Sequence, residues 1–378
     1  MARASTQRSP PTCAPIRAIG PRLRRRAEMD KSELLARVQR GEPVSQHDFS
    51  GWDLEGADLS ATVFDRCTFE GARLMRADLG ESRLIGCRLA GADMSESRLA
   101  NTVLADCHFE RTLMTSAELA NVCFHECRIV SLALNRARLD FVTLSRCAVD
   151  MLSLADADAE KLTVADSQVQ RVDFSGTQLA RSAWVECDLR QARFSATQLR
   201  HVVLVRCNLE GQRFSGLHFE NVQFIGAQLA GSDFTGARIA QANFQQADLK
   251  QARFERAHGP NAIFMDADLE GACFDGAMLR QALFINARAA GASFRGADLY
   301  QTNWRGAQAP KVVLSDCELT YADFSHADLS AADLKGSAMF RANLHGVRDA
   351  DAHYTDRARA LESDTQLLAA ERWQSHPA

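Results

Sequence analysis

Large apolar side chains recur every five residues through most of this 378-residue chain. From Phe49 to Leu344 the frame has 60 centre positions, and 56 of them carry Leu, Phe, Met, Ile, Val or Trp. The exceptions are Ala159, Gly259, Ala289 and Ala309. A period of five fits neither an amphipathic helix, with 3.6 residues, nor a half-buried strand, with two. An unbroken period of this length predicts a repeat architecture.

A second site in each pentad is small. The site two residues before the centre is alanine in every pentad from Ala237 to Ala297. The site just before the centre is often Asp or Asn, as Asp58 and Asn243 show. Two side chains on the same face, separated by one residue on the other face, make a minimal strand, and the other residues of the pentad must turn the chain. We expect Asp or Asn beside the centre to accept hydrogen bonds from backbone N–H groups at this corner.

The pentads GADLS, RADLG, QANFQ, QADLK and RANLH resemble the A-(D/N)-L-x-x consensus of the pentapeptide-repeat family. The resemblance implies an all-β solenoid, a right-handed quadrilateral parallel β-helix with four pentads per coil. The centre and the residue two before it would point inward, and the other three would face solvent. About 15 coils stacked ~4.8 Å apart would make a rod roughly 70 Å long.

Several side chains are expected to fill the interior of this rod. Phenylalanine recurs every ten residues from Phe234 to Phe294, so Phe234 should stack on Phe254 while Phe244 lies on the opposite wall. The expected core centres are Leu59, Leu79, Phe109, Phe174, Phe234, Phe244, Phe254, Phe274, Phe294 and Leu329. Eight cysteines two residues before a centre should form one inward column that returns every twenty residues: Cys67, Cys87, Cys107, Cys127, Cys147, Cys187, Cys207 and Cys317.

These cysteines are interpreted as small core residues. They lack accompanying histidines and the C-x-x-C spacing of a zinc site. Stacked coils hold β-carbons farther apart than the ~3.8 Å of a disulfide. No cofactor or metal is therefore expected.

The chain divides into four segments. Residues 1–28 hold seven arginines, one acidic residue and four prolines; they are either a disordered basic segment that contacts nucleic acid or a stretch upstream of the true start at Met29. Residues 29–45 should form an N-terminal capping helix, residues 46–348 the repeat, and residues 349–378 a C-terminal capping helix and tail.

Local signals support both helices. Asp30 as N-cap and Glu33 three residues later form a capping box, and Gly41 marks the stop. At the other end, Leu361, Leu368 and Trp373 are available to pack against the rod. The alternative for the C-terminal segment is binding to a partner or dimerisation.

Catalysis is not expected. His108, His218 and His258 should face outward on separate coils, and the ten histidines should not converge. A filled solenoid offers no internal pocket. Gly259 and Pro260 interrupt the pattern, which predicts either a local bulge or, together with His258, a partner contact; Ala289 and Ala309 should leave a shallow dent.

Function is therefore expected on the outer surface. The resemblance implies two classes, a DNA-mimicking protector of a type II topoisomerase such as gyrase and a protein-interaction scaffold. Residues 46–345 carry 30 basic and 38 acidic side chains, a net charge of −8, whereas a duplex of similar length would carry about 40 negative charges. This favours the scaffold, and nucleic acid is not expected as a partner of the rod.

The stretch SELLARVQRGEPVSQHDFSGWDLEGADLS resembles the entry into pentapeptide arrays associated with bacterial type VI secretion. The resemblance implies an accessory or effector-loading factor that binds secretion components. No run approaches the ~18 apolar residues of a membrane span, and no apolar signal segment follows Arg26, so we expect a cytoplasmic protein. It should be a monomer or an end-to-end dimer joined through the C-terminal segment.

Overall fold

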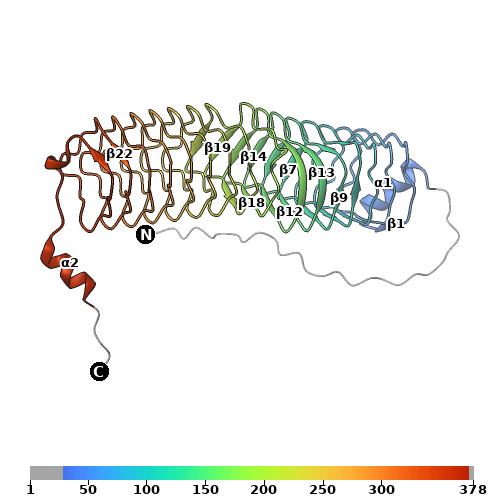
Figure 1. The fold of residues 1–378 in the computed structure, drawn as a ribbon. Coiled ribbons are helices and arrows are strands. Elements are labelled where there is room, and N and C mark those ends of the chain that lie inside the picture. Colours follow the sequence, from blue (N-terminus) through green and yellow to red (C-terminus); the bar gives the residue numbers. More distant parts are fainter. Residues whose placement is uncertain (1–28, 374–378) are drawn as a thin grey trace, which may run out of the picture.

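The computed structural model describes residues 29–373. They form a right-handed quadrilateral parallel β-helix of about 16 turns, with helix α1 (Lys31–Gln39) at one end and α2 (Thr365–Arg372) at the other (Figure 1). Partners in neighbouring coils are twenty residues apart, as Phe64 and Leu84 are. The predicted fold is therefore confirmed, whereas the predictions for residues 1–28 lie outside the described residues.

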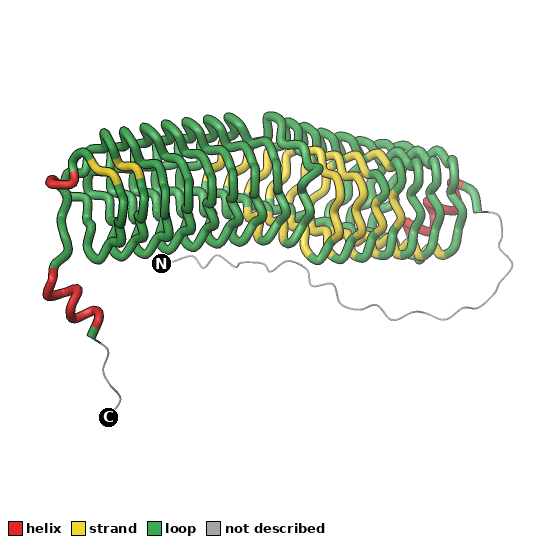
Figure 2. Tube along the Cα trace, viewed as in Figure 1, coloured by secondary structure: helices red, strands yellow, loops and turns green. Residues whose placement is uncertain are grey.

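We number the four walls by their inward centres. Wall 1 contains Phe64, wall 2 Phe69, wall 3 Leu74 and wall 4 Leu79, and each series repeats every twenty residues. Extended strands are concentrated in the N-terminal half, and much of the C-terminal half consists of isolated bridges and turns (Figure 2).

Four parallel sheets follow these walls. The nine-stranded sheet lies on wall 1: β1 (Val44–Ser45), β2 (Val63–Asp65), β3 (Arg83–Ile85), β4 (Val103–Ala105), β8 (Cys123–His125), β12 (Thr143–Ser145), β15 (Thr163–Ala165), β18 (Ala183–Val185) and β20 (Val203–Val205). Wall 4 carries six strands: β7 (Glu118–Ala120), β11 (Arg138–Asp140), β14 (Asp158–Glu160), β17 (Gln178–Ala180), β19 (Gln198–Arg200) and β21 (His218–Glu220). Walls 2 and 3 share six strands: β5 (His108–Phe109), β6 (Thr112–Leu113), β9 (Arg128–Ile129), β10 (Leu132–Ala133), β13 (Ala148–Ser153) and β16 (Gln168–Asp173). The fourth sheet pairs β22 (Asp333–Leu334) with β23 (His353–Tyr354).

Most right-angle corners are tight turns with one left-handed residue. The corners at Ser131, Met151, Arg171 and Gln191 lack the positive φ, and strands β13 and β16 run through two of them. At the corner after Leu54, the Ala57 N–H donates to the Leu54 carbonyl over 3.0 Å, and Gly56 has a φ of 63°. This positive φ at the third turn residue is the geometry of a type II turn. The expected side-chain support is also present, because the Ser60 N–H donates to Asp58 Oδ1 over 3.1 Å.

The interior is filled as predicted. All ten expected core centres are at most 1 % exposed. The Phe234 and Phe254 rings stack with centroids 4.7 Å apart and planes 1° apart. Phe244 meets Phe254 edge to face across the interior, with centroids 5.7 Å apart and planes at 88°. The stacked pair therefore shares wall 3, and Phe244 lies on wall 1.

The cysteine prediction is correct for seven residues and wrong for one. Cys67, Cys87, Cys107, Cys127, Cys147, Cys187 and Cys207 are buried in one column of wall 2. The position of Cys317 within the twenty-residue coil differs from theirs by half a coil. It therefore lies on wall 4, in the column of Ala297 and Ser337. It too is buried. The thiols donate to backbone carbonyls, as Cys107 Sγ does to Leu84 O over 3.3 Å.

The predicted bulge at Gly259 is absent. The residue faces inward and the ladder is regular on both sides, since the Gly259 N–H donates to Met278 O over 2.8 Å. Glycine is needed because a Cβ there would lie 2.7 Å from Ile239 Cγ1 and 3.1 Å from Leu279 Cδ2. The neighbours fill the space that a larger centre would occupy.

The predicted surface dent is absent as well. Ala289 and Ala309 point inward and are fully buried. In the coil that contains Ala309, wall 1 carries the fully buried Trp304, whose ring stacks 4.1 Å from that of Phe284. Both small residues therefore lie within the filled interior of the rod.

The two ends of the rod differ. As predicted, α1 caps the first coil: the Glu33 N–H donates to Asp30 Oδ1, and Leu34 and Val38 are buried. At the C-terminal end, the predicted boundary between the repeat and the capping segment, residue 348, is wrong. The ladder itself continues to Leu361, which pairs with Asn343.

Helix α2 lies beside the C-terminal end of the rod and does not extend across it (Figure 1), and its Glu371 contacts His326 and His345 of the rod. The exposed fractions of Leu361, Leu367 and Trp373 are 47 %, 50 % and 77 %. The expected packing of Leu361 and Trp373 therefore does not occur, and Leu368 is only partly buried.

Candidate functional surface

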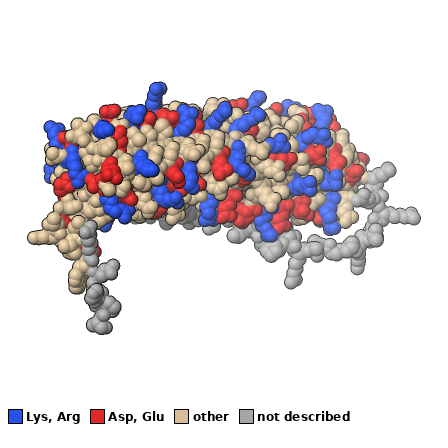
Figure 3. Space-filling view, viewed as in Figure 1, with Lys and Arg blue, Asp and Glu red and all other residues tan. Residues whose placement is uncertain are grey.

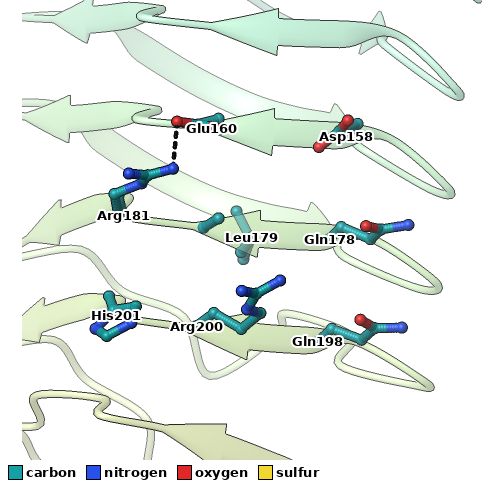
Figure 4. A pocket seen from close by; sticks show the side chains of 9 residues that line it. Asp158, Glu160, Gln178, Leu179, Arg181, Gln198, Arg200 and His201 are labelled. Carbon is teal, nitrogen blue, oxygen red and sulfur yellow. Dashed lines mark ion pairs between the residues drawn. The ribbon is translucent and has the colours of Figure 1, made fainter.

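A shallow hollow on wall 4 lies over strands β14, β17 and β19. Figure 4 shows Asp158, Glu160, Arg181, Arg200 and His201 around it. Its charged groups pair between coils: Arg181 Nη2 lies 2.7 Å from Glu160 Oε1, and Arg200 Nε lies 3.3 Å from Glu220 Oε2. The hollow presents no hydroxyl or thiol nucleophile beside a base, so these residues do not form a hydrolytic site of that kind.

Charges elsewhere on the rod also pair between adjacent coils. Arg98 lies 2.9 Å from Asp78, and Arg348 lies 3.0 Å from Asp328. On the face drawn in Figure 3, both signs of charge are intermixed. This face is therefore not the dense, single-signed surface of a duplex.

Two histidines converge near the C-terminal end, contrary to the sequence expectation. His326 Nε2 and His345 Nε2 lie 3.3 Å and 3.0 Å from Glu371 Oε2 of α2. Their separation of 19 residues places them in adjacent coils at one corner. These hydrogen bonds, chiefly the one from His345, lower the pKa of the Glu371 carboxyl.

The hydrogen bonds of His345 decide what this cluster can do. The Asp364 N–H donates to His345 Nδ1 over 3.2 Å. In a neutral imidazole, the proton is then on Nε2, which donates to Glu371. A protonated nitrogen cannot ligate a metal, and ligating histidines usually donate through their other nitrogen. The arrangement fits a polar attachment of α2 better than a metal centre.

Exposed aromatic side chains gather on the C-terminal half of wall 4. The Tyr321 ring lies 5.9 Å from both the Tyr300 and the Phe340 rings. The Arg280 guanidinium lies 4.3 Å from the Tyr300 centroid. Met278, Tyr321 and Phe340 are 49 %, 42 % and 48 % exposed. We call these five residues, Met278, Arg280, Tyr300, Tyr321 and Phe340, the wall 4 patch.

The residues expected to contact a partner border this patch. His258 is exposed and pairs with Met278 in the ladder, while Pro260 is half-buried and Gly259 is buried. The aromatic residues were not predicted. Tyr300 and Phe340 directly follow a wall 4 centre and Tyr321 lies one position further along its pentad, so they converge only once the coils are stacked. Partner contact at His258–Pro260 stays a prediction.

Comparison with known proteins supports the fold. The profile described as a pentapeptide repeat region matches residues 57–134 and 177–254, and that of eight-copy pentapeptide repeats matches segments between residues 242 and 346. No curated protein matches the chain. Among residues 29–373, no helix has the length and apolar character needed to cross a membrane.

Solved structures include similar chains. HetL, a pentapeptide repeat protein involved in heterocyst differentiation regulation from Nostoc sp. strain PCC 7120, is 20 % identical with a TM-score of 0.31, over 61 % of this chain and 97 % of HetL. QnrB1, a plasmid-mediated fluoroquinolone resistance protein, is 19 % identical with a TM-score of 0.27, over 59 % of this chain and 97 % of QnrB1. Because the family profiles match along most of the repeat, this chain belongs to the pentapeptide-repeat family.

Proposed function

We propose that this protein is a non-enzymatic scaffold that binds another protein through the wall 4 patch. The carrying observation is the exposure of Met278, Tyr321 and Phe340 beside Arg280 on an otherwise charged wall. Tyr, Phe, Met and Arg are the residue types enriched in protein interfaces. The adjoining residues His258 and Pro260 extend this contact.

The proposed context is type VI secretion in the bacterial cytoplasm, where the rod acts as an accessory or effector-loading factor. Its support is the resemblance of residues 32–60 to the entry of arrays from that system. A long rigid rod with paired surface charges suits the holding of partners at fixed spacing.

The test is co-purification with the tagged full chain from cells that express a type VI system. We expect secretion components in the eluate, and we expect Tyr321→Ser combined with Phe340→Ser to remove them. Phe141→Ser is the matched control, because Phe141 is 47 % exposed and occupies the same corner position as Tyr321. An eluate without secretion components would contradict the proposed context, and retention by the double variant would contradict the proposed surface.

A supercoiling assay with gyrase tests the alternative function, a DNA mimic that protects a type II topoisomerase. A net charge of −8 on residues 46–345 provides far too few negative charges to copy a duplex, which carries one per ~1.7 Å. We expect no change in supercoiling at equimolar protein. Inhibition or protection of gyrase at that concentration would replace the scaffold with a DNA mimic.

A further inference from the structure

Wall 1 differs from the other three walls in its outward side chains. Two outward positions flank each centre, and ten consecutive coils, residues 103–285 on wall 1, contain twenty such positions on each wall. None of the twenty residues on wall 1 is Asp, Glu, Lys or Arg, whereas the corresponding twenty carry 11 charges on wall 2, 8 on wall 3 and 10 on wall 4. These two outward rows of wall 1 therefore carry no charge over ten consecutive coils.

The outward face of wall 1 is also largely apolar. Its apolar members are Val103, Ala105, Cys123, Ala165, Ala183, Val185, Val203, Val205, Ile225, Ile263, Met265, Leu283 and Ile285. The strands β4, β12, β15, β18 and β20 alternate between half-buried outward residues and a fully buried centre. We call the outward residues of these ten coils the wall 1 face.

Charges return at the edge of this face. The corner beside it carries Glu126, Arg146, Glu186 and Arg206, which pair with one another: Arg146 lies 3.1 Å from Glu126, and Arg206 Nε lies 2.8 Å from Glu186. An apolar centre with a polar rim is the composition of a protein interface. Parallel sheets, moreover, usually have both faces covered.

The spacing of the face indicates what covers it. Its side chains form rows that repeat every ~4.8 Å along the rod, whereas the turns of an α-helix repeat every ~5.4 Å and lose register within a few turns. A second copy of this chain has the same repeat along its whole length. Its own wall 1 is equally uncharged, so no charge is buried when the two faces meet.

The area is sufficient for such a contact. Ten coils span about 48 Å, and the two outward rows with their side chains span about 12 Å. Each chain would then bury about 600 Å², or about 1,200 Å² in total, which reaches the lower end of stable interfaces. A two-fold axis makes the same face serve both chains.

From the uncharged wall, its polar rim, its matching repeat and its area, we propose that two copies of this protein pair side by side through the wall 1 face. This dimer leaves both ends of the rod free. It differs from an end-to-end dimer, which would join the chains through α2.

The experiment is sedimentation velocity of the full chain and three double variants. Val205→Arg with Ile225→Arg introduces two charges at the wall 1 face. Ala230→Arg with Ala240→Arg introduces the same charges at the same pentad position on walls 2 and 4. Leu367→Ser with Trp373→Ser removes the two large exposed apolar side chains of α2 and its C-cap. Circular dichroism melting verifies that each variant is folded.

We expect the unaltered chain to sediment as a dimer of 41.6 kDa protomers. The wall 1 variant should dissociate at least about tenfold more readily, because burying an unpaired charge is costly. The wall 2 and 4 variant and the α2 variant should remain dimeric. A monomeric unaltered chain at about 100 µM, a folded wall 1 variant that still dimerises, or loss of the dimer in the α2 variant would each overturn the proposal.

Discussion

Glycine is favoured at two kinds of position in this rod, for different physical reasons: at corners, where Ala61 and Ala196 show that other residues are tolerated, and at one inward site. At the corner residue Gly231, φ is 65° and a Cβ would meet nothing within 4 Å, so only the left-handed backbone disfavours alanine. At the inward residue Gly259, a Cβ would lie 2.7 Å from Ile239 Cγ1. One substitution therefore reports backbone strain at the first site and overpacking at the second.

We expect Gly231→Ala to reduce the free energy of unfolding by about 1 kcal/mol and Gly259→Ala to reduce it by about 1–3 kcal/mol. Because Ile239→Ala removes the side-chain atoms that the new methyl group meets, it should recover part of the second loss and none of the first. Guanidinium unfolding of the single and double variants measures this coupling. Strictly additive effects of Gly259→Ala and Ile239→Ala would contradict the overpacking account.

The inward thiols should be unreactive toward alkylating reagents in the folded protein. Burial raises the pKa of the Cys317 thiol to about 12, so little thiolate exists at pH 8, and the walls exclude reagents. We expect iodoacetamide at pH 8 to spare Cys107 and Cys317 in the folded protein and to alkylate both in guanidinium, as measured by peptide mass spectrometry. Cys273, which is only partly buried, is the internal control. Labelling of Cys107 as fast as Cys273 would contradict a closed interior.

At the scale of elements, α2 is attached mainly through polar contacts. The hydrogen bond from His345 lowers the pKa of Glu371 from its usual 4.5. A carboxyl group with a lowered pKa in the attached state stabilises attachment above pH 4.5, and this contribution is lost as pH falls through the lowered value. Attachment of α2 should therefore weaken in acid.

Hydrogen exchange of residues 365–372 measures this attachment. After correction for the intrinsic pH dependence of exchange, we expect less protection below pH 4.5 than at pH 7. Glu371→Ala should lose protection at both pH values. Gln366→Ala, which is exposed and takes no part in the contact, should behave like the unaltered chain. Unchanged protection in Glu371→Ala would show that the carboxylate does not hold α2.

The two terminal helices also indicate which elements can be predicted from sequence. Helix α1 was predictable because its signals are local. The Asp30 side chain accepts a hydrogen bond from the backbone N–H three residues later, and the buried residues Leu34 and Val38 lie one turn apart. The position of α2 depends on contacts with His326 and His345 in two earlier coils. These contacts become visible only when the coils are stacked and the last residues of the ladder are placed.

At the scale of the molecule, the period of five and the resemblance of its pentads to a known consensus were enough to predict the fold and the buried centres, because nearly every pentad makes the same turn. Assignment to walls needs the period of twenty as well. Cys317 shows the difference, since it has the right place in its pentad and yet lies opposite the other column. The wall 1 face and the wall 4 patch were missed for the same reason: Val205 and Ile225, or Tyr300 and Tyr321, become neighbours only after residues are sorted by wall.

The period of twenty also predicts how the rod responds to deletions. Removing residues 263–282 joins Ala262 to Leu283 and takes out one whole coil, so every later residue keeps its wall and its stacking partners of the same type. Removing residues 263–280 is a smaller change in mass, but it shifts the later chain by two positions. Outward charged residues would then point into the core, at a cost of several kcal/mol for each unpaired charge.

We expect the twenty-residue deletion to fold as a rod one coil shorter, with a melting temperature within a few degrees of the full chain, because stability in a solenoid comes from contacts between neighbouring coils. The eighteen-residue deletion should lose the C-terminal part of the rod and expose it to proteolysis. Circular dichroism melting and limited trypsin digestion measure both outcomes. Equal behaviour of the two deletions would mean that twenty residues do not complete one coil, and the assignment of residues to walls would fail with it.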